Sequence, residues 1–430
     1  MSETRPQSKS TDITVDFADR FHNLRQRSES LVETLSDADA TVQSMEDASP
    51  AKWHLAHTTW FFEEFIVAPL RGEQARFDDQ FQYLFNSYYD GIGPRHARPM
   101  RGMLTRPTLD HVLEYRQHVN AHVLGILKSG NTDIAPLMAL GIAHEEQHQE
   151  LLLTDILHLF AQSPIKPAFS PSKPLQMDPA HDRTGWVAFD GGVTSIGADT
   201  QSSDEFAFDC EGPRHDVLLH PYALATHAVT NQQWADFISD GSYQESRLWL
   251  SDGFARCQQD EWIAPLYWER RDDEWWNMTL RGFQPVDMNA PVCQVSFFEA
   301  DAFATWTGHR LPSEFEWENA AREPSTDGNN AGTGRLRPAP QPRATKENPL
   351  VGLFGDVWEW TSSAFRPYPG FKPDNGAVGE YNGKFMSGQM VLRGASCVTA
   401  ANHTRATYRN FFHPDKRWQF SGLRLAKDAS

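Results

Sequence analysis

The stretch that decides the fold of the first half of the chain reads Ala143-His144-Glu145-Glu146-Gln147-His148-Gln149-Glu150. In a helix, residues four apart lie on one face, one turn above the other, so His144 and His148 can bind one metal ion together. The stretch also matches His-Glu-x-x-His, the zinc-protease pattern in which the first Glu is a general base. Two interpretations are open at this point: a protease site, or another metal site with the same spacing.

The motif belongs to the last of four segments in which apolar residues recur at helical spacing. These segments are residues 12–35, 53–67, 108–128 and 134–161. Four long helices with one long connection predict a four-helix bundle, in which metal sites are built from side chains on facing helices. A third ligand is therefore expected from another helix. His57 is the candidate, and His54, at one turn's distance, is its rival.

The sequence changes character after residue 161. Residues 162–184 are rich in Pro and Ser and predict a linker. Beyond it, short β-like runs are separated by turn residues, and brief helices are predicted at 231–238 and 297–307. The β-like runs include residues 186–189, 217–219 and 391–393. Residues 322–348, rich in Pro, Gly and Asn, are expected to form a long surface loop.

These patterns predict an α+β chain in two domains. The predicted divisions are a disordered tail at 1–11, a helical bundle at 12–161, the linker at 162–184 and a mixed, loop-dominated domain at 185–430. A length of 430 residues allows two or three domains, each able to bury a core.

Charge and composition exclude several classes of protein. The net charge of −18 and the isoelectric point near 5.4 argue against nucleic acid or an anionic membrane as the main partner. The four cysteines are scattered without a CxxC pair, which favours a reducing cytosol over a disulfide framework or a cysteine-based zinc site. The polar N-terminus lacks an apolar signal region, and no run approaches the roughly 18 apolar residues of a membrane span. A cytoplasmic location is expected.

The metal site itself has rival interpretations. The paired histidines could be structural, and Glu145, Glu146 and Glu150 could be a solvated helix face. A carboxylate could instead join two histidines in a facial iron triad. The protease interpretation requires a third ligand downstream and a strand to hold a peptide, and the sequence shows neither.

Two sets of motifs resemble one enzyme family. Residues 53–64 (Trp-His-Leu-Ala-His-Thr-Thr-Trp-Phe-Phe-Glu-Glu) together with 144–150 resemble the DinB-like domain of the EgtB family, the non-haem iron sulfoxide synthases of ergothioneine biosynthesis. The second half resembles the formylglycine-generating, C-type-lectin-like domain fused to it in that family. The matching pieces are residues 229–234, 291–297, 308–318, 355–361, 391–396, 408–410 and 422–424. The copper-binding cysteine pair of true formylglycine-generating enzymes is absent, because residues 401–426 contain no cysteine.

The resemblance implies a cofactor, substrates and a ligand set. His57, His144 and His148 would bind Fe(II), with O₂ as co-substrate. The substrates would be hercynine, which is trimethylated histidine, and a cysteine thiol. Gln147 and Asn410 match positions that hold hercynine in the family. The expected product is S-(hercyn-2-yl)cysteine S-oxide.

The sulfur donor separates two branches of that family. The γ-glutamylcysteine branch has an acidic residue where this chain has Phe412 and an Arg where it has Lys416. At the position of that branch's catalytic Tyr this chain has Val378, and Tyr381 is a weaker candidate for the same role.

The cysteine-using branch carries a Tyr-Tyr pair, matched here by Tyr88-Tyr89, as proton or hydrogen donors. The expected substrate contacts are Gln147, Asn410, Phe411, Phe412, and Arg95 and Arg98 as a carboxylate clamp. The alternatives are a γ-glutamylcysteine, histidine (ovothiol-type) or selenosugar substrate, or a zinc-bound or non-catalytic binding module.

Overall fold

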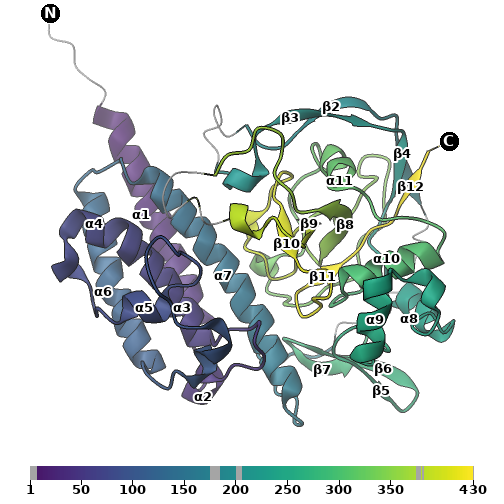
Figure 1. The fold of residues 1–430 in the computed structure, drawn as a ribbon, viewed down its shortest axis with the longest axis horizontal. Coiled ribbons are helices and arrows are strands. Elements are labelled where there is room, and N and C mark those ends of the chain that lie inside the picture. Colours follow the sequence, from purple (N-terminus) through teal and green to yellow (C-terminus); the bar gives the residue numbers. More distant parts are fainter. Residues whose placement is uncertain (1–6, 175–184, 200–205, 374–378, 380–381, 430) are drawn as a thin grey trace, which may run out of the picture. The chain divides into compact units, whose positions relative to one another are not determined.

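The computed structural model describes residues 7–174, 185–199, 206–373, 379 and 382–429. The chain divides into two compact units (Figure 1). The first extends to Gln162, and the second takes in the chain from Ser163 on, apart from residues 376–381. The first unit is helical and the second mixes short strands with helices. Among the described residues, no helix is long and apolar enough to cross a lipid bilayer.

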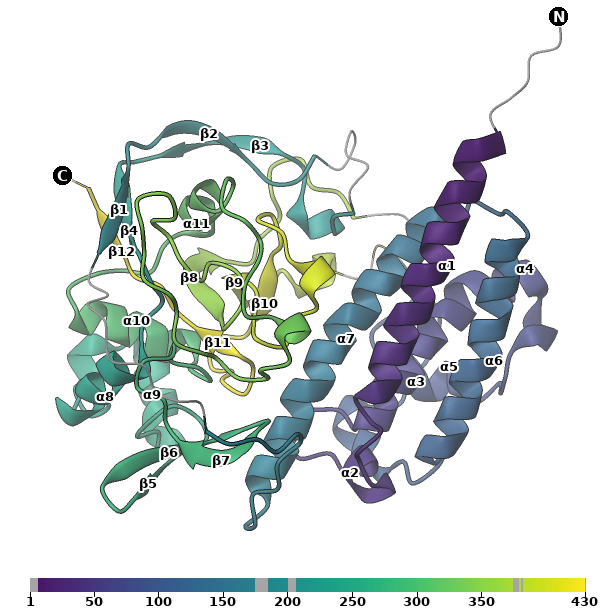
Figure 2. The ribbon, with the colours of Figure 1, turned by 180° about the vertical axis from the view of Figure 1, so that it is seen from behind.

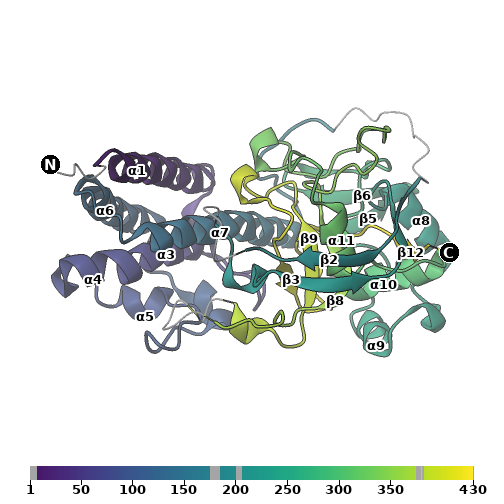
Figure 3. The same ribbon diagram turned by 90° about the horizontal axis from the view of Figure 1, so that it is seen from above.

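The first unit is a four-helix bundle (Figures 1, 2 and 3). Its long helices are α1 (Gln7–Ser30), α3 (Ala51–Phe62), α6 (Leu109–Lys128) and α7 (Ala135–Gln162). Both α1 and α3 pack against α6 and α7. Three short helices lie in the connections: α2 (Asp37–Thr41), α4 (Ala68–Arg71) and α5 (Phe81–Phe85). A π-helical turn, η1 (Glu63–Val67), joins α3 to α4 without a break.

The first helix begins earlier than the sequence pattern predicted. Residues 7–11, expected to belong to a disordered tail, are helical, and the helix ends at Ser30 rather than at residue 35. No Gly or Pro interrupts Gln7–Ser30, and once a helix has formed each further residue adds one backbone hydrogen bond. At the start of α6, Thr108 caps the helix, because its side chain accepts a hydrogen bond from the His111 backbone N–H.

A buried charged network fixes α7 within the bundle. Glu145 accepts hydrogen bonds from Arg25 of α1 at 2.7 Å and from Arg116 of α6 at 2.8 Å. Arg25 also donates to the Thr59 hydroxyl of α3 at 2.7 Å. All four side chains are buried. Burial raises the pKa of the Glu145 carboxyl, but Arg25 and Arg116 outweigh this and lower it to about 2. The carboxylate is therefore ionised and joins α7 to the other three long helices.

The described part of the second unit contains four small sheets. Strands β1 (Trp186–Phe189), β4 (Tyr222–Ala225) and β12 (Ala426–Asp428) form one, and β2 (Gly192–Ile196) pairs with β3 (His215–Leu219). A third has the order β10 (Asn410–Phe412), β9 (Met390–Gly394), β8 (Trp358–Ala364) and β11 (Ser421–Gly422). The fourth is the meander β5 (Trp268–Arg271), β6 (Glu274–Thr279) and β7 (Gly282–Pro285).

The α-helices that accompany these sheets in the described residues are α8 (Asn231–Ser239), α9 (Ser251–Gln259), α10 (Phe297–Trp306) and α11 (Glu314–Ala320). Strands were expected where β1, β3 and β9 lie, and helices where α8 and α10 lie. Neither α9, α11 nor the β5–β7 meander was predicted. Around Trp317 of α11, a core cluster includes Leu224, Leu353 and Phe354. All four cysteines, Cys210, Cys257, Cys293 and Cys397, are buried in this unit as free thiols.

The predicted surface loop at 322–348 is in fact partly buried. Asn329 and Gln341 are 8% and 4% exposed. The carboxylate of Asp356 accepts hydrogen bonds from the Asn329 side chain at 2.6 Å and the Ala339 backbone N–H at 3.0 Å. Polar residues can leave water here because a buried carboxylate supplies the acceptors they need.

Replacing Glu145 tests whether it is structural or a protease-like general base. Glu145→Gln removes the buried counter-charge of Arg25 and leaves Arg116 only the half-exposed Glu29, 3.4 Å away, so the free energy of unfolding should fall by about 3–5 kcal/mol. Urea denaturation followed by circular dichroism measures it. The exposed Glu114→Gln on α6 is the control and should stay within about 0.5 kcal/mol of the parent. Unchanged stability in Glu145→Gln would contradict the structural role.

A second pair of variants tests the close packing of the two helices that carry the histidines. A Cβ at Gly141 of α7 would lie 2.6 Å from Phe62 Cε1, so Gly141→Ala should lower the free energy of unfolding by about 1–3 kcal/mol. At Gly125 of α6 the nearest atom is the Arg71 guanidinium, at 3.9 Å. The same change there should raise the free energy of unfolding by about 0.5–1 kcal/mol. If both variants change the free energy of unfolding in the same direction, the close packing of Gly141 against Phe62 is contradicted.

Candidate metal centre

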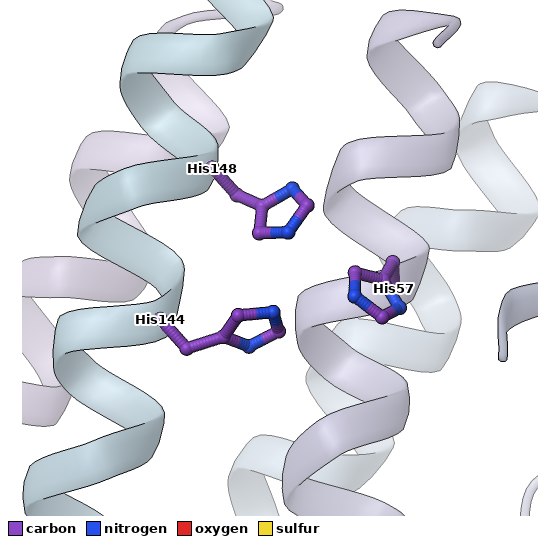
Figure 4. Close-up of side chains that lie close together, drawn as sticks. All are labelled: His57, His144 and His148. Atoms are coloured by element: carbon purple, nitrogen blue, oxygen red, sulfur yellow. The ribbon is translucent and has the colours of Figure 1, made fainter. Parts of the chain in front are cut away.

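Three histidines converge between α3 and α7. His57 comes from α3, and His144 and His148 from successive turns of α7. Their donor nitrogens all lie within 4.8 Å of one another. Figure 4 shows the three imidazole rings pointing into the same space between the two helices. A metal bound at about 2.1 Å from each nitrogen would draw the donors closer together, which small ring rotations can supply.

The environment keeps these imidazoles neutral. His57 and His144 are completely buried. Burial lowers the pKa of His144 to about 3, and burial together with the neighbouring His144 lowers the pKa values of His57 and His148 well below the usual range. A metal binds the neutral form of imidazole, so no proton has to be displaced at neutral pH.

A hydrogen bond fixes which nitrogen of His57 is available. Its Nδ1 lies 2.6 Å from the Phe85 carbonyl oxygen, which only accepts, so Nδ1 carries the proton and donates. Nε2 is left with its lone pair, and this buried atom has no hydrogen-bond partner among the described residues. The ring is stacked with Trp53 at a centroid distance of 4.6 Å and with Trp60 at 5.6 Å. An oriented, desolvated lone pair of this kind fits a metal ligand.

The donor set excludes the carboxylate alternatives within the described residues. The three-residue group contains no carboxylate. Glu145, the general base in the protease interpretation, is bound to Arg25 and Arg116 instead. Three neutral imidazoles leave coordination positions for substrates, and imidazole suits iron(II) as well as zinc.

The Tyr pair lies near this centre through aromatic contacts. Tyr89 is completely buried and packs on Trp60 at a centroid distance of 5.4 Å. Trp60 in turn is stacked with His57, and Tyr88 is stacked on Tyr89 at 4.8 Å. Tyr88 is less buried than Tyr89. Their catalytic role stays a prediction.

The predicted arginine clamp is not brought together at a buried site. Arg95 forms an ion pair with Asp90, and Arg98 donates to the Asp47 carbonyl oxygen; both side chains are exposed. In the same loop Arg101 is buried, and its guanidinium carbon lies over the Trp53 ring, 3.4 Å from the ring centroid. Burial lowers its pKa well below the usual range. In the sequence, the only signal for Arg101 is that it follows Arg95 and Arg98 in an Arg-rich loop.

The remaining predicted substrate contacts fall in both units. Gln147 lies on α7 between the two histidines of that helix. Asn410, Phe411 and Phe412 form β10 of the second unit, paired antiparallel with β9. Phe411 stacks on Phe365 at 4.1 Å, and Phe412 meets Trp418 edge-on at 5.7 Å. Val378 and Tyr381 lie outside the described residues.

Sequence reasoning missed one residue with a direct bearing on the ligands. Asp155 bonds to His54, and His54 bonds to His148, so the rival third ligand turns out to be a neighbour of the metal site. No pattern in the sequence signals this contact. Asp155 reads only as a polar residue in a mostly apolar helix, seven positions after His148.

Comparison with known proteins supports both domain types predicted from the sequence. Residues 172–429 match the sulfatase-modifying factor enzyme 1-like domain family, and residues 20–152 match the DinB superfamily. These matches confirm the predicted fold class.

Three curated relatives extend over nearly the whole chain, and each is named hercynine oxygenase. The protein of Mycolicibacterium smegmatis is 31% identical over 96% of this chain and 98% of its own length. That of Mycobacterium tuberculosis is 32% identical over 91% and 94%, and that of Mycolicibacterium thermoresistibile 32% over 96% and 95%. With this likeness across both domains, the chain belongs to the hercynine oxygenase (EgtB) family and is an oxidoreductase.

Proposed function

We propose that this protein is an iron(II)- and O₂-dependent sulfoxide synthase that joins cysteine to the imidazole ring of hercynine. The observation that carries the proposal is the group of three neutral histidines in a chain of this family. Forming the C–S bond removes two electrons and two hydrogens, from S–H and C–H. Oxidising the sulfur removes two more electrons. One O₂ accepts all four, leaving one oxygen atom in the sulfoxide and the other in water.

The chain's residues have distinct roles in this proposal. When bound, iron(II) supplies the one-electron chemistry that lets O₂ react with a thiol. His57, His144 and His148 hold it and add no charge, so a substrate thiolate is attracted to the site. The amides of Gln147 and Asn410 bind hercynine. A phenol of Tyr88 or Tyr89 supplies a proton or hydrogen atom that favours C–S bond formation over oxidation of the thiol alone.

Free cysteine is favoured as the sulfur donor. Phe412, partly buried against Trp418, offers no charge for a γ-glutamyl ammonium group. Lys416 is 3.4 Å from Asp415, so its charge is already partnered. Arg95 and Arg98 would exchange Asp90 and the Asp47 carbonyl for the carboxylate of the amino acid, which their exposed guanidinium groups can bind in a bidentate manner.

The reaction assay tests the substrates directly. Protein loaded anaerobically with Fe(II) should, on addition of O₂, hercynine and cysteine, give S-(hercyn-2-yl)cysteine S-oxide by mass spectrometry. Parallel reactions contain γ-glutamylcysteine or a selenosugar in place of cysteine, or histidine in place of hercynine. Product from γ-glutamylcysteine alone would overturn the assignment of the sulfur donor.

Matched histidine variants are the controls for that assay. His144→Ala should lose both stoichiometric iron and product, whereas His22→Ala, an exposed histidine of α1, should retain both. Stoichiometric zinc in anaerobically purified protein, with no iron-dependent O₂ uptake, would favour the non-catalytic binding module.

Tyrosine variants test the proposed donor. Tyr88→Phe or Tyr89→Phe should retain iron but shift product from the sulfoxide toward cysteine sulfinate by at least about tenfold, since loss of a general acid costs 10²–10⁴-fold in its own step. The ratio of the two products is measured by mass spectrometry. Tyr83→Phe, at an exposed position on α5, should leave the ratio unchanged. An unchanged ratio in both test variants would place the catalytic phenol elsewhere.

A further inference from the structure

A second histidine of α3 contacts the metal site without belonging to the donor group. Nδ1 of His54 lies 2.9 Å from Nδ1 of His148, and Nε2 of His54 lies 3.0 Å from Oδ2 of Asp155. The same carboxylate oxygen accepts a hydrogen bond from the Ser49 backbone N–H at 2.8 Å. His54 is 3% and Asp155 6% exposed, so the contact between them is shielded from water, whereas the contact of His54 with His148 is partly buried.

The positions of the protons follow from what each group can donate. A carboxylate oxygen only accepts, so Nε2 of His54 carries a proton and donates to Asp155. With its one proton on Nε2, His54 has a lone pair on Nδ1, which accepts. The donor to it is Nδ1–H of His148, and the lone pair of His148 is therefore on Nε2.

We propose that His54 and Asp155 are positioning residues for the metal ligand His148. They hold His148 as its Nδ1–H tautomer, present Nε2 to the metal, and strengthen that nitrogen as a donor through the carboxylate at the end of the chain. The inference rests on the metal site of the proposed function but not on its substrates.

The three ligands are consequently not equivalent. His57 donates its Nδ1–H to a neutral backbone carbonyl, that of Phe85. His148 donates to an imidazole that is itself bound to an anion. A hydrogen bond that ends on a charge polarises the ring more than one that ends on a neutral carbonyl, so His148 should be the stronger donor.

Metal affinity separates this role from one in helix packing alone. His54→Leu fills the site but leaves Nδ1–H of His148 without an acceptor, so the Kd for Co(II), measured anaerobically by chelator competition, should rise about 10–100-fold. In His54→Asn the amide oxygen can take the place of Nδ1, and most of the affinity should return. Asp155→Asn keeps an acceptor but loses the charge, so its Kd should lie between those of the parent and His54→Leu.

The control is His158, which lies on α7 like the ligand His148 and also bonds to a side chain of another segment. His158 bonds to the Ser44 hydroxyl at 2.7 Å and does not belong to the donor group. His158→Leu should leave the Kd for Co(II) within about twofold of the parent, well below the 10–100-fold change that loss of a ligand's hydrogen-bond partner produces. Circular dichroism of each metal-free variant shows whether it is folded.

A spectroscopic measurement reports the tautomer itself. Long-range ¹H–¹⁵N NMR of the zinc-loaded, ¹⁵N-histidine-labelled protein should show His148 protonated at Nδ1 and metal-bound through Nε2. Binding through Nδ1, or a Kd in folded His54→Leu no higher than in His158→Leu, would overturn the inference and leave the proposed function standing. A parent protein that binds no divalent metal would overturn the proposed function, and the inference with it.

Discussion

The ion pairs of Glu145 with Arg25 and Arg116 are the constraint on which the first unit depends. A carboxylate and two guanidinium groups are costly to bury, and the cost is offset only when all three are present in good geometry. Because the partners come from three different helices, the network sets the rotation of α7 about its own axis. The neighbouring residue, His144, is then directed to another side of the helix, toward α3 and His57. The residues that resemble a protease motif thus separate into a proposed metal ligand, His144, and a structural anchor, Glu145.

The centre is built from three kinds of support, each suited to a different ligand. His57 is held by stacking with Trp53 and Trp60 and by a backbone carbonyl. The direction of the His144 side chain is set by the neighbouring Glu145, whose ion pairs fix the rotation of α7. His148 meets a side-chain partner on the facing helix. Supports drawn from backbone, helix rotation and side chains restrict all three rings before any metal is bound, which lowers the entropy lost on binding.

The sequence was sufficient for the features that depend on local periodicity. Apolar spacing indicated all four long helices of the bundle, and the i,i+4 spacing indicated His144 and His148 as a pair. Spacing left the third member open between His57 and His54, and the family resemblance pointed to His57. The sequence was not sufficient for features that are determined by contacts between distant segments. The helix α11 is short, and Trp317 within it is held by a core assembled from distant segments, which no local pattern reveals. The loop at 322–348 was predicted to lie on the surface because it is rich in Pro, Gly and Asn, although part of it is buried against the Asp356 carboxylate. The contact of His54 with Asp155 likewise joins residues on different helices, so spacing along the chain does not indicate it.

The burial of the four cysteines has a consequence for the thiol and O₂ chemistry proposed for this protein. Burial raises the pKa of the Cys257 thiol to about 11 and raises that of Cys210 further. Since the thiolate is the form that attacks disulfides and is attacked by oxidants, these side chains are poor partners in both reactions. A small-molecule thiol and its disulfide can therefore be present at high concentration without forming mixed disulfides at Cys257 or Cys210. All four thiols of the chain are buried, so none is exposed to compete with the proposed thiol substrate for oxidation.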